Sequence, residues 1–244
     1  MQQNCNDMPM QVDQRFFVDL NLGTACNFRC EYCFEQGCYT SMSMRKDVLE
    51  RFLTLAKIIL DNGSHLEICF WGGEPMLYFD TVIKVIDSLY QYDNVSFLLY
   101  TNGWFVRKQG QILENIVDKC GWRFTLQISH DFMPNELNHR VMPGKTRAEV
   151  EAHVLDAFRW CDEREINFSA KSTSTIDDME HHLFEQYMTF FEFRNSLRHK
   201  ENFSLAITPD TSNKKMIDEQ ALGEQLHKLL VFWAKNKIVH SCSP

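Results

Sequence analysis

The sequence predicts an α/β fold in which helices cover a parallel β-sheet. Six short apolar segments, each followed by a segment of helical periodicity, run along the 244 residues with no low-complexity linker between them. Such alternation is typical of parallel strands with helices packed outside them. Six units are fewer than the eight of a closed barrel, so periodicity leaves two architectures open: an open doubly wound sheet and a partial barrel.

The predicted elements follow one another along the chain. The first strand is predicted over 16–22 and the first helix over 44–62, with an apolar stripe expected to face the core, made of Val48, Phe52, Leu55 and Ile59. Further strands are predicted over 66–71, 95–101, 123–129, 166–172 and 203–207. Further helices are predicted over 79–92, 107–119, 146–163, 177–198 and 217–236. The whole reads as one domain over 15–237, with an N-terminal extension over 1–14 and a C-terminal tail over 238–244.

Composition and charge narrow the classes of function. The 44% hydrophobic and 24% charged residues are typical of a soluble globular protein, and the net charge of −8 argues against a general nucleic-acid-binding surface. No apolar run approaches the roughly 18 residues of a membrane span, and the N-terminus has no export signal. Nine cysteines, an odd number in a long chain, indicate reduced thiols instead of a disulfide framework. We therefore expect a cytoplasmic protein without a membrane or nucleic-acid partner.

Three cysteines follow the first predicted strand. Cys26, Cys30 and Cys33 have the spacing C-x-x-x-C-x-x-C. A structural zinc site needs a fourth ligand, and the other cysteines form no matching pair. His181 and His182 are adjacent on a predicted helix, so they cannot both face one metal and are expected at the surface. Three thiolates also suit a four-iron cluster whose remaining iron is open to a small molecule. Zinc is the alternative.

Further motifs follow the next three predicted strands. They are GGEP after the second strand, TNG after the third and SHD after the fourth. Because the carboxyl ends of parallel strands share one edge of a sheet, we expect all of them and the cysteines to surround one ligand site. Gly72 and Gly73 allow backbone to approach a ligand closely, and Pro75 fixes the exit from their turn.

Two of these motifs resemble the radical S-adenosylmethionine (SAM) superfamily: CNFRCEYC, with Tyr32 before the third cysteine, and WGGEP at the end of the second strand. The resemblance implies a partial (β/α)6 barrel of TIM type with outer helices. It also implies a 4Fe–4S cluster held by the three cysteines, with SAM on the open iron. In that family the reduced cluster cleaves SAM to a 5′-deoxyadenosyl radical, which takes a hydrogen atom from the substrate. Glu74 would offer its carboxylate to the SAM ammonium group.

Later stretches resemble one branch of the superfamily, the SPASM branch, which includes sulfatase-maturing enzymes. SFLLYTNG, with Asn102, resembles its third strand, and LQISHDFMPNELNHRVMPGKT resembles its fourth. The match makes Ser129 and Arg140 candidates for binding the SAM carboxylate or ribose hydroxyls. Two positions depart from the branch: His130 replaces an apolar residue, and Phe132 replaces a glycine. We expect the Phe132 ring to reshape the substrate side of the pocket.

The end of the chain gives weaker indications. Lys171, or its neighbour Ser172, on the fifth strand and Asp210 after the sixth are candidates for contact with the substrate or SAM. The resemblance covers the core barrel of the SPASM branch but not its cysteine-rich auxiliary domain. Cys242 stands alone where that domain would begin, and we expect it to bind nothing.

The resemblance implies an enzyme that acts on a peptide or protein side chain and takes electrons from a donor such as flavodoxin or ferredoxin. A glycyl-radical activating enzyme or a small-molecule radical SAM enzyme is the first alternative, since such enzymes are comparably short. A catalytically idle iron–sulfur or zinc-binding module is the second.

Overall fold

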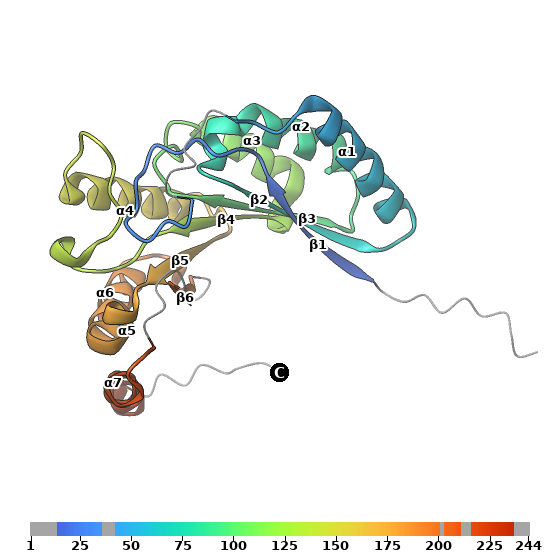
Figure 1. Ribbon diagram of the computed structural model, residues 1–244. Helices are drawn as coiled ribbons and strands as arrows, with labels where there is room; N and C mark the ends of the chain where they lie inside the picture. Colours follow the sequence, from blue (N-terminus) through green and yellow to red (C-terminus); the bar gives the residue numbers. More distant parts are fainter. Residues whose placement is uncertain (1–13, 36–41, 201–202, 211–215, 237–244) are drawn as a thin grey trace, which may run out of the picture.

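The computed structural model describes residues 14–35, 42–200, 203–210 and 216–236, which contain one six-stranded sheet (Figure 1). Its strands are β1 (Arg15–Asn21), β2 (His65–Trp71), β3 (Val95–Thr101), β4 (Phe124–Ser129), β5 (Phe168–Ser174) and β6 (Leu205–Pro209). Each strand pairs in parallel with the next in chain order. A doubly wound sheet would show a reversal of strand order, and this sheet has none. The sheet is a curled half-barrel, which confirms the partial (β/α)6 barrel.

The helices surround the outside of the curled sheet (Figure 1). They are α1 (Lys46–Asp61), α2 (Phe79–Leu89), α3 (Gly110–Cys120), α4 (Arg147–Glu163), α5 (Ile176–His181), α6 (Leu183–Asn195) and α7 (Glu219–Asn236). Three short 3-10 turns span Pro75–Tyr78, Gly121–Arg123 and Asn135–Leu137. The single helix predicted over 177–198 is wrong, because His182 has non-helical φ and ψ angles of −123° and 0° and separates α5 from α6. Helix α7 packs on α5 and α6.

Burial alternates along the strands. In β3, Val95, Phe97 and Leu99 are buried, whereas the residues between them are only partly buried. Strands β4 and β5 repeat this pattern, and the buried side chains join those of the helices in one core. The sheet is therefore covered by helices on one face. Its other, concave face stays accessible, unlike either face of a doubly wound sheet.

The buried face of α1 is displaced by one residue from the predicted stripe. The buried side chains are Leu49, Leu53, Ala56 and Leu60. Val48 and Leu55, which were predicted to face the core, are 42% and 56% exposed. Both series have the same spacing along the helix, so periodicity could not separate them. Packing against the sheet buries the series that begins at Leu49 and leaves Val48 and Leu55 exposed.

The ends of the predicted domain fall mostly on residues outside the described ranges. These include residues 1–13, the tail over 238–244 and Cys242. At the N-terminal boundary, the Gln14 carbonyl accepts a hydrogen bond from the His65 amide at 2.9 Å, beside the first residue of β1. Within the described ranges, no helix is long and apolar enough to cross a membrane.

Candidate functional site

A cavity of about 610 Å³ lies at the carboxyl ends of the strands. Every residue proposed above as a ligand or contact lines it, apart from Ser172, the alternative to Lys171: Cys26, Cys30, Tyr32, Cys33, Gly72, Gly73, Glu74, Pro75, Asn102, Ser129, Arg140, Lys171 and Asp210. Sequence reasoning did not anticipate several other lining residues, among them Asp19, Phe28, Trp71, Tyr100 and Thr208. Parallel register thus brings together loops that are far apart in the sequence.

The loop after β1 carries the three cysteines as partly buried thiols that form no disulfide among the described residues. Its backbone is tied to the segment after β4, because the Arg29 amide donates to the Val141 carbonyl at 2.6 Å and the Glu31 amide to the His139 carbonyl at 3.0 Å. Burial raises the pKa of Cys26 to about 11. This thiol is therefore protonated at neutral pH and must release its proton to bind a metal.

The GGEP turn packs directly on the start of the cysteine loop. Gly72 has a φ of +129°, and a Cβ atom added there would lie 2.3 Å from the Gly23 carbonyl oxygen. A Cβ on Gly73 would lie 2.4 Å from the Ala25 carbonyl oxygen. The amides of Gly73 and Glu74 donate to these two carbonyls, each at 2.9 Å. The two glycines therefore permit close contact between the GGEP turn and the start of the cysteine loop.

Glu74 joins the ends of β2 and β3. Its side chain is 1% exposed and accepts hydrogen bonds from the Met76 amide (3.0 Å), the Thr101 hydroxyl (2.8 Å) and the Asn102 amide (2.7 Å). Burial raises the pKa of the carboxyl group, and these donors oppose the shift. A carboxylate has about four acceptor sites, so three protein donors leave room for one from a ligand.

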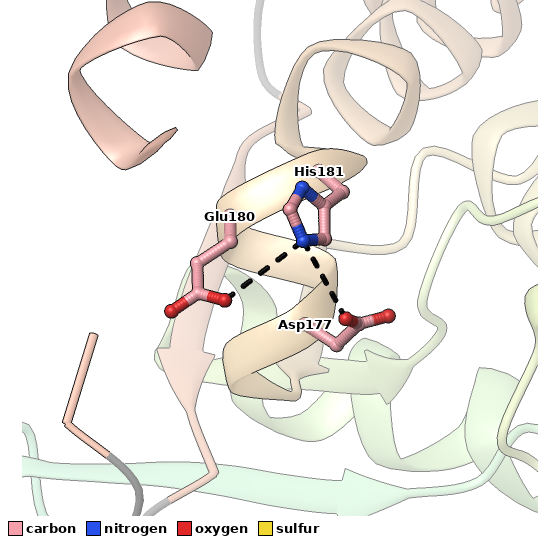
Figure 2. Close-up of side chains that lie close together, drawn as sticks. All are labelled: Asp177, Glu180 and His181. Carbon is pink, nitrogen blue, oxygen red and sulfur yellow. Dashed lines mark ion pairs between the residues drawn. The ribbon is translucent and has the colours of Figure 1, made fainter. Parts of the chain in front are cut away.

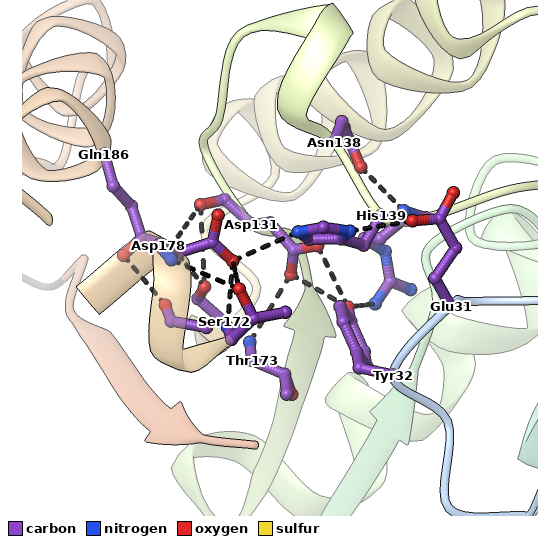
Figure 3. A network of polar contacts seen from close by, with 12 residues as sticks. Glu31, Tyr32, Asp131, Asn138, His139, Ser172, Thr173, Asp178 and Gln186 are labelled. Atoms are coloured by element: carbon purple, nitrogen blue, oxygen red, sulfur yellow. Dashed lines mark hydrogen bonds and ion pairs between the residues drawn. The ribbon is translucent and has the colours of Figure 1, made fainter. Parts of the chain in front are cut away.

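Tyr32 and Asp131 belong to a polar network (Figure 3). This network supports Arg140, which is 6% exposed. Arg140 Nη1 donates to the Tyr32 hydroxyl at 3.1 Å, and that hydroxyl donates to the Asp131 carboxylate at 2.9 Å. The guanidinium also lies over the Phe28 ring, 5.3 Å from its centroid. Arg140 Nε is buried and has no hydrogen-bond partner within the described residues. A buried cation with an unused donor in a cavity wall is suited to an anionic ligand group.

Residues 20–188, well over half of the chain, match the Radical SAM superfamily. The chain belongs to the radical SAM superfamily. A 4Fe–4S cluster and SAM are the cofactors characteristic of this superfamily. Three cysteine thiols and a buried arginine around one cavity are groups that fit both.

Individual relatives of this radical SAM chain are distant. It is 28% identical to the radical SAM cyclopropyl synthase TigE of Paramaledivibacter caminithermalis, over 35% of this chain and 22% of that protein. It is 27% identical to a GTP 3′,8-cyclase of Trichodesmium erythraeum, over 54% and 39% of the two chains. Among solved structures, anSMEcpe with bound AdoMet has a TM-score of 0.68 at 20% identity, over 92% of this chain and 61% of that one. At that identity the likeness shows the shared fold.

The two departures from the SPASM pattern point away from the cavity. His130 is buried, with Nε2 2.9 Å from Glu151 and Nδ1 accepting from the Phe132 amide at 3.0 Å. Phe132 has a φ of +53°, a left-handed conformation that favours the glycine of the branch. Its ring is fully buried in an aromatic cluster with Phe158, Phe190, Phe193 and Phe203. The prediction that Phe132 reshapes the substrate side of the pocket is therefore wrong.

Strands β5 and β6 supply the far wall of the cavity. The Lys171 ammonium lies 5.3 Å from the centroid of the Tyr100 ring, and Lys171 is the register partner of Ser129. Ser172 points to the opposite face and is fully buried, because side chains alternate along a strand. Asp210 follows β6 and lines the cavity. The alternatives on the fifth strand are thus resolved in favour of Lys171.

A second cluster of charged side chains lies outside the cavity (Figure 2). Among the described residues, ligand atoms of Asp177, Glu180 and His181 lie within 4.8 Å of one another. His181 Nε2 is 3.7 Å from Asp177 and 3.9 Å from Glu180, and Glu180 accepts from the Asp218 amide at 2.7 Å. These contacts join α5 to the start of α7. His181 is exposed, as expected, whereas His182 is partly buried.

Proposed function

We propose that this chain is the core of an enzyme that uses a 4Fe–4S cluster and SAM to modify a peptide or protein side chain by radical chemistry. The observation that carries the proposal is the meeting of three cysteine thiols, the GGEP turn and the Ser129–Arg140 wall in one cavity. When bound and reduced, the cluster and SAM supply a 5′-deoxyadenosyl radical.

In this proposal Cys26, Cys30 and Cys33 hold the cluster. Among the described residues, no other cysteine lines the cavity, so one iron is left for SAM. The loop is anchored by its two backbone bonds to the segment after β4 and by its contact with the GGEP turn. These contacts hold the three thiols near their binding positions before the metal arrives.

The walls beside the cysteines bind SAM. The Arg140 guanidinium in the cavity wall binds the carboxylate, and Ser129 offers a hydroxyl at the end of β4. Glu74 accepts a hydrogen bond from the ammonium group with its remaining capacity. Asn102 and the backbone of the GGEP turn line the cavity beside Glu74, and Tyr32 lines it beside Arg140.

The far wall is left for the substrate. Lys171 and Asp210 carry charges there, and Thr208 of β6 also lines this wall. A peptide substrate is supported by the solved structure of anSMEcpe with AdoMet and the Kp18Cys peptide, which has a TM-score of 0.68 to this chain at 20% identity. The GTP 3′,8-cyclases among the relatives favour a small-molecule substrate as the second candidate. A flavodoxin or ferredoxin would supply the electron.

The deciding experiment is anaerobic reconstitution with iron and sulfide, followed by dithionite and SAM. Formation of 5′-deoxyadenosine is expected, and an intact cluster without this product would refute the enzyme and favour the idle module. Incubation with peptide pools and, separately, with GTP distinguishes the two substrate classes. A mass shift of a peptide supports the first candidate, and conversion of GTP supports the second.

A further inference from the structure

Asp131 is a buried acid that the proposed function does not use. Its side chain is 1% exposed, and it does not line the cavity. The carboxylate accepts from the Tyr32 hydroxyl at 2.9 Å and from the Thr173 amide at 3.4 Å. A buried carboxylate is costly unless it balances a nearby cation. Burial raises the pKa of Asp131, and the charges of Arg140 and, to a smaller extent, His130 oppose this shift. Of these two residues, Arg140 is linked to Asp131 through the Tyr32 hydroxyl.

The Tyr32 hydroxyl links the Arg140 guanidinium to the Asp131 carboxylate through two hydrogen bonds of defined direction. It accepts from Arg140 Nη1 at 3.1 Å and donates to Asp131, so the acid fixes the orientation of the hydroxyl hydrogen (Figure 3). With its hydrogen turned toward Asp131, the oxygen presents a lone pair to Arg140. One side of the guanidinium is thereby held, while Nε remains without a partner among the described residues.

We propose that Asp131 is a positioning residue for the SAM carboxylate: through the Tyr32 hydroxyl, it holds the Arg140 guanidinium in place in the cavity wall for that carboxylate. The inference rests on the proposed binding of SAM at Arg140. We expect Asp131 to affect the binding of the SAM carboxylate and of no other part of SAM.

The fold does not by itself require the charge of Asp131. The main-chain carbonyl of Asp131 accepts from Gln186 Nε2 of α6 at 2.6 Å and from the Ser172 hydroxyl of β5 at 3.5 Å, and its side chain is linked to β5 by the contact with the Thr173 amide at 3.4 Å. An Asp131→Asn substitution keeps this carbonyl and the side-chain volume. It removes the charge that faces Arg140.

A matched control is present at the other end of the barrel. Asp162, near the end of α4, is 3% exposed and accepts from the Arg198 and His199 amides at 2.7 and 2.9 Å. It lines a separate cavity. Asp162→Asn therefore reports what the neutralisation of a buried acid does to stability alone.

The experiment measures equilibrium binding of SAM and of decarboxylated SAM to the anaerobically reconstituted protein, with iron content and melting temperature determined for each variant. Asp131→Asn is expected to weaken SAM binding about tenfold at unchanged iron content, and Tyr32→Phe to act in the same direction. Asp162→Asn is expected to leave SAM binding unchanged. Decarboxylated SAM, which lacks the group that Arg140 binds, is expected to show no difference between the wild type and Asp131→Asn.

Two results would overturn the inference while leaving the proposed function intact. The first is SAM binding by Asp131→Asn within twofold of the wild type. The second is an equal loss of affinity for SAM and decarboxylated SAM, which would make Asp131 a purely structural residue. A wild-type protein that carries the cluster but binds no SAM refutes the proposed function itself, and the inference with it.

Discussion

The two halves of the cavity wall are built differently. On the side of β1 to β4, loops are fastened to one another by backbone hydrogen bonds and by buried side chains such as Glu74 and Arg140. On the side of β5 and β6, the wall consists of residues on these two strands and of Asp210 directly after them, and β6 has no buried residue. A cofactor common to a superfamily needs fixed geometry, whereas a substrate that differs between members needs replaceable side chains.

The largest effect that this comparison predicts is at the cysteines. Cys30→Ala removes one of the three thiols on the side of β1 to β4, which we call the fixed half. We expect loss of the cluster and of 5′-deoxyadenosine formation. Iron and sulfide analysis and the visible absorbance of the reconstituted protein measure it. Cys120→Ala, at a buried cysteine that does not line the cavity, is the control and should keep the cluster. An intact, active cluster in Cys30→Ala would exclude the assignment.

The next effect is at Glu74, which fastens two loops of the fixed half. In Glu74→Gln an amide group faces backbone and hydroxyl donors, so one of them loses its acceptor. We expect a loss of about 2–3 kcal/mol in the free energy of unfolding, together with weaker SAM binding. Urea unfolding measures the first. Glu114→Gln, at an exposed ion pair with Arg164, should cost less than about 1 kcal/mol. Equal losses in the two variants would contradict the role of Glu74.

A smaller, pH-dependent effect is expected where the two halves meet. His139 lies between Glu31 of the cysteine loop (2.9 Å) and Asp178 of α5 (3.1 Å), and the hydrogen bond to Asp178, followed by that to Glu31, raises its pKa from 6.5 to about 9. Because the folded-state pKa is the higher one, the stabilisation is complete below pH 6.5 and is lost as the pH rises through 9. After allowance for solvent screening, we expect about 1 kcal/mol.

Unfolding free energies of the wild type and His139→Gln between pH 6 and pH 10 test the contribution of the His139 contacts with Glu31 and Asp178. The difference between the two proteins should shrink as the pH rises. A constant difference across this range would mean that the charge of His139 does not contribute.

The smallest effect is predicted for Lys171, on the side of β5 and β6, which we call the replaceable half. Lys171→Met keeps the apolar stem over Tyr100 and removes the charge. We expect SAM affinity and substrate-free 5′-deoxyadenosine formation to stay within twofold of the wild type. Arg140→Gln, measured beside it, should lose most SAM affinity. A comparable loss in Lys171→Met would place Lys171 in the SAM site and remove the distinction between the halves.

The sequence by itself determined the order of the strands, the family and a large part of the residues around the cavity. It could do so because backbone demands restrict residue choice: glycines where two loops touch, and cysteines at fixed spacing. Phe132 shows the limit of this reasoning. Its left-handed backbone follows the family pattern, but the direction of its ring depended on an aromatic cluster assembled from α4, α6 and residue 203.

Periodicity left the half-barrel and a doubly wound sheet open, because alternation along a strand does not reveal what covers each face. The family resemblance implied the half-barrel, and the tertiary structure confirmed it. The tertiary structure also showed which face of α1 is buried and that α5 and α6 are separate helices. It further showed that Asp131 is linked to Arg140 through the Tyr32 hydroxyl. These features depend on contacts between residues far apart in the chain. Local periodicity and spacing carry no information about such contacts.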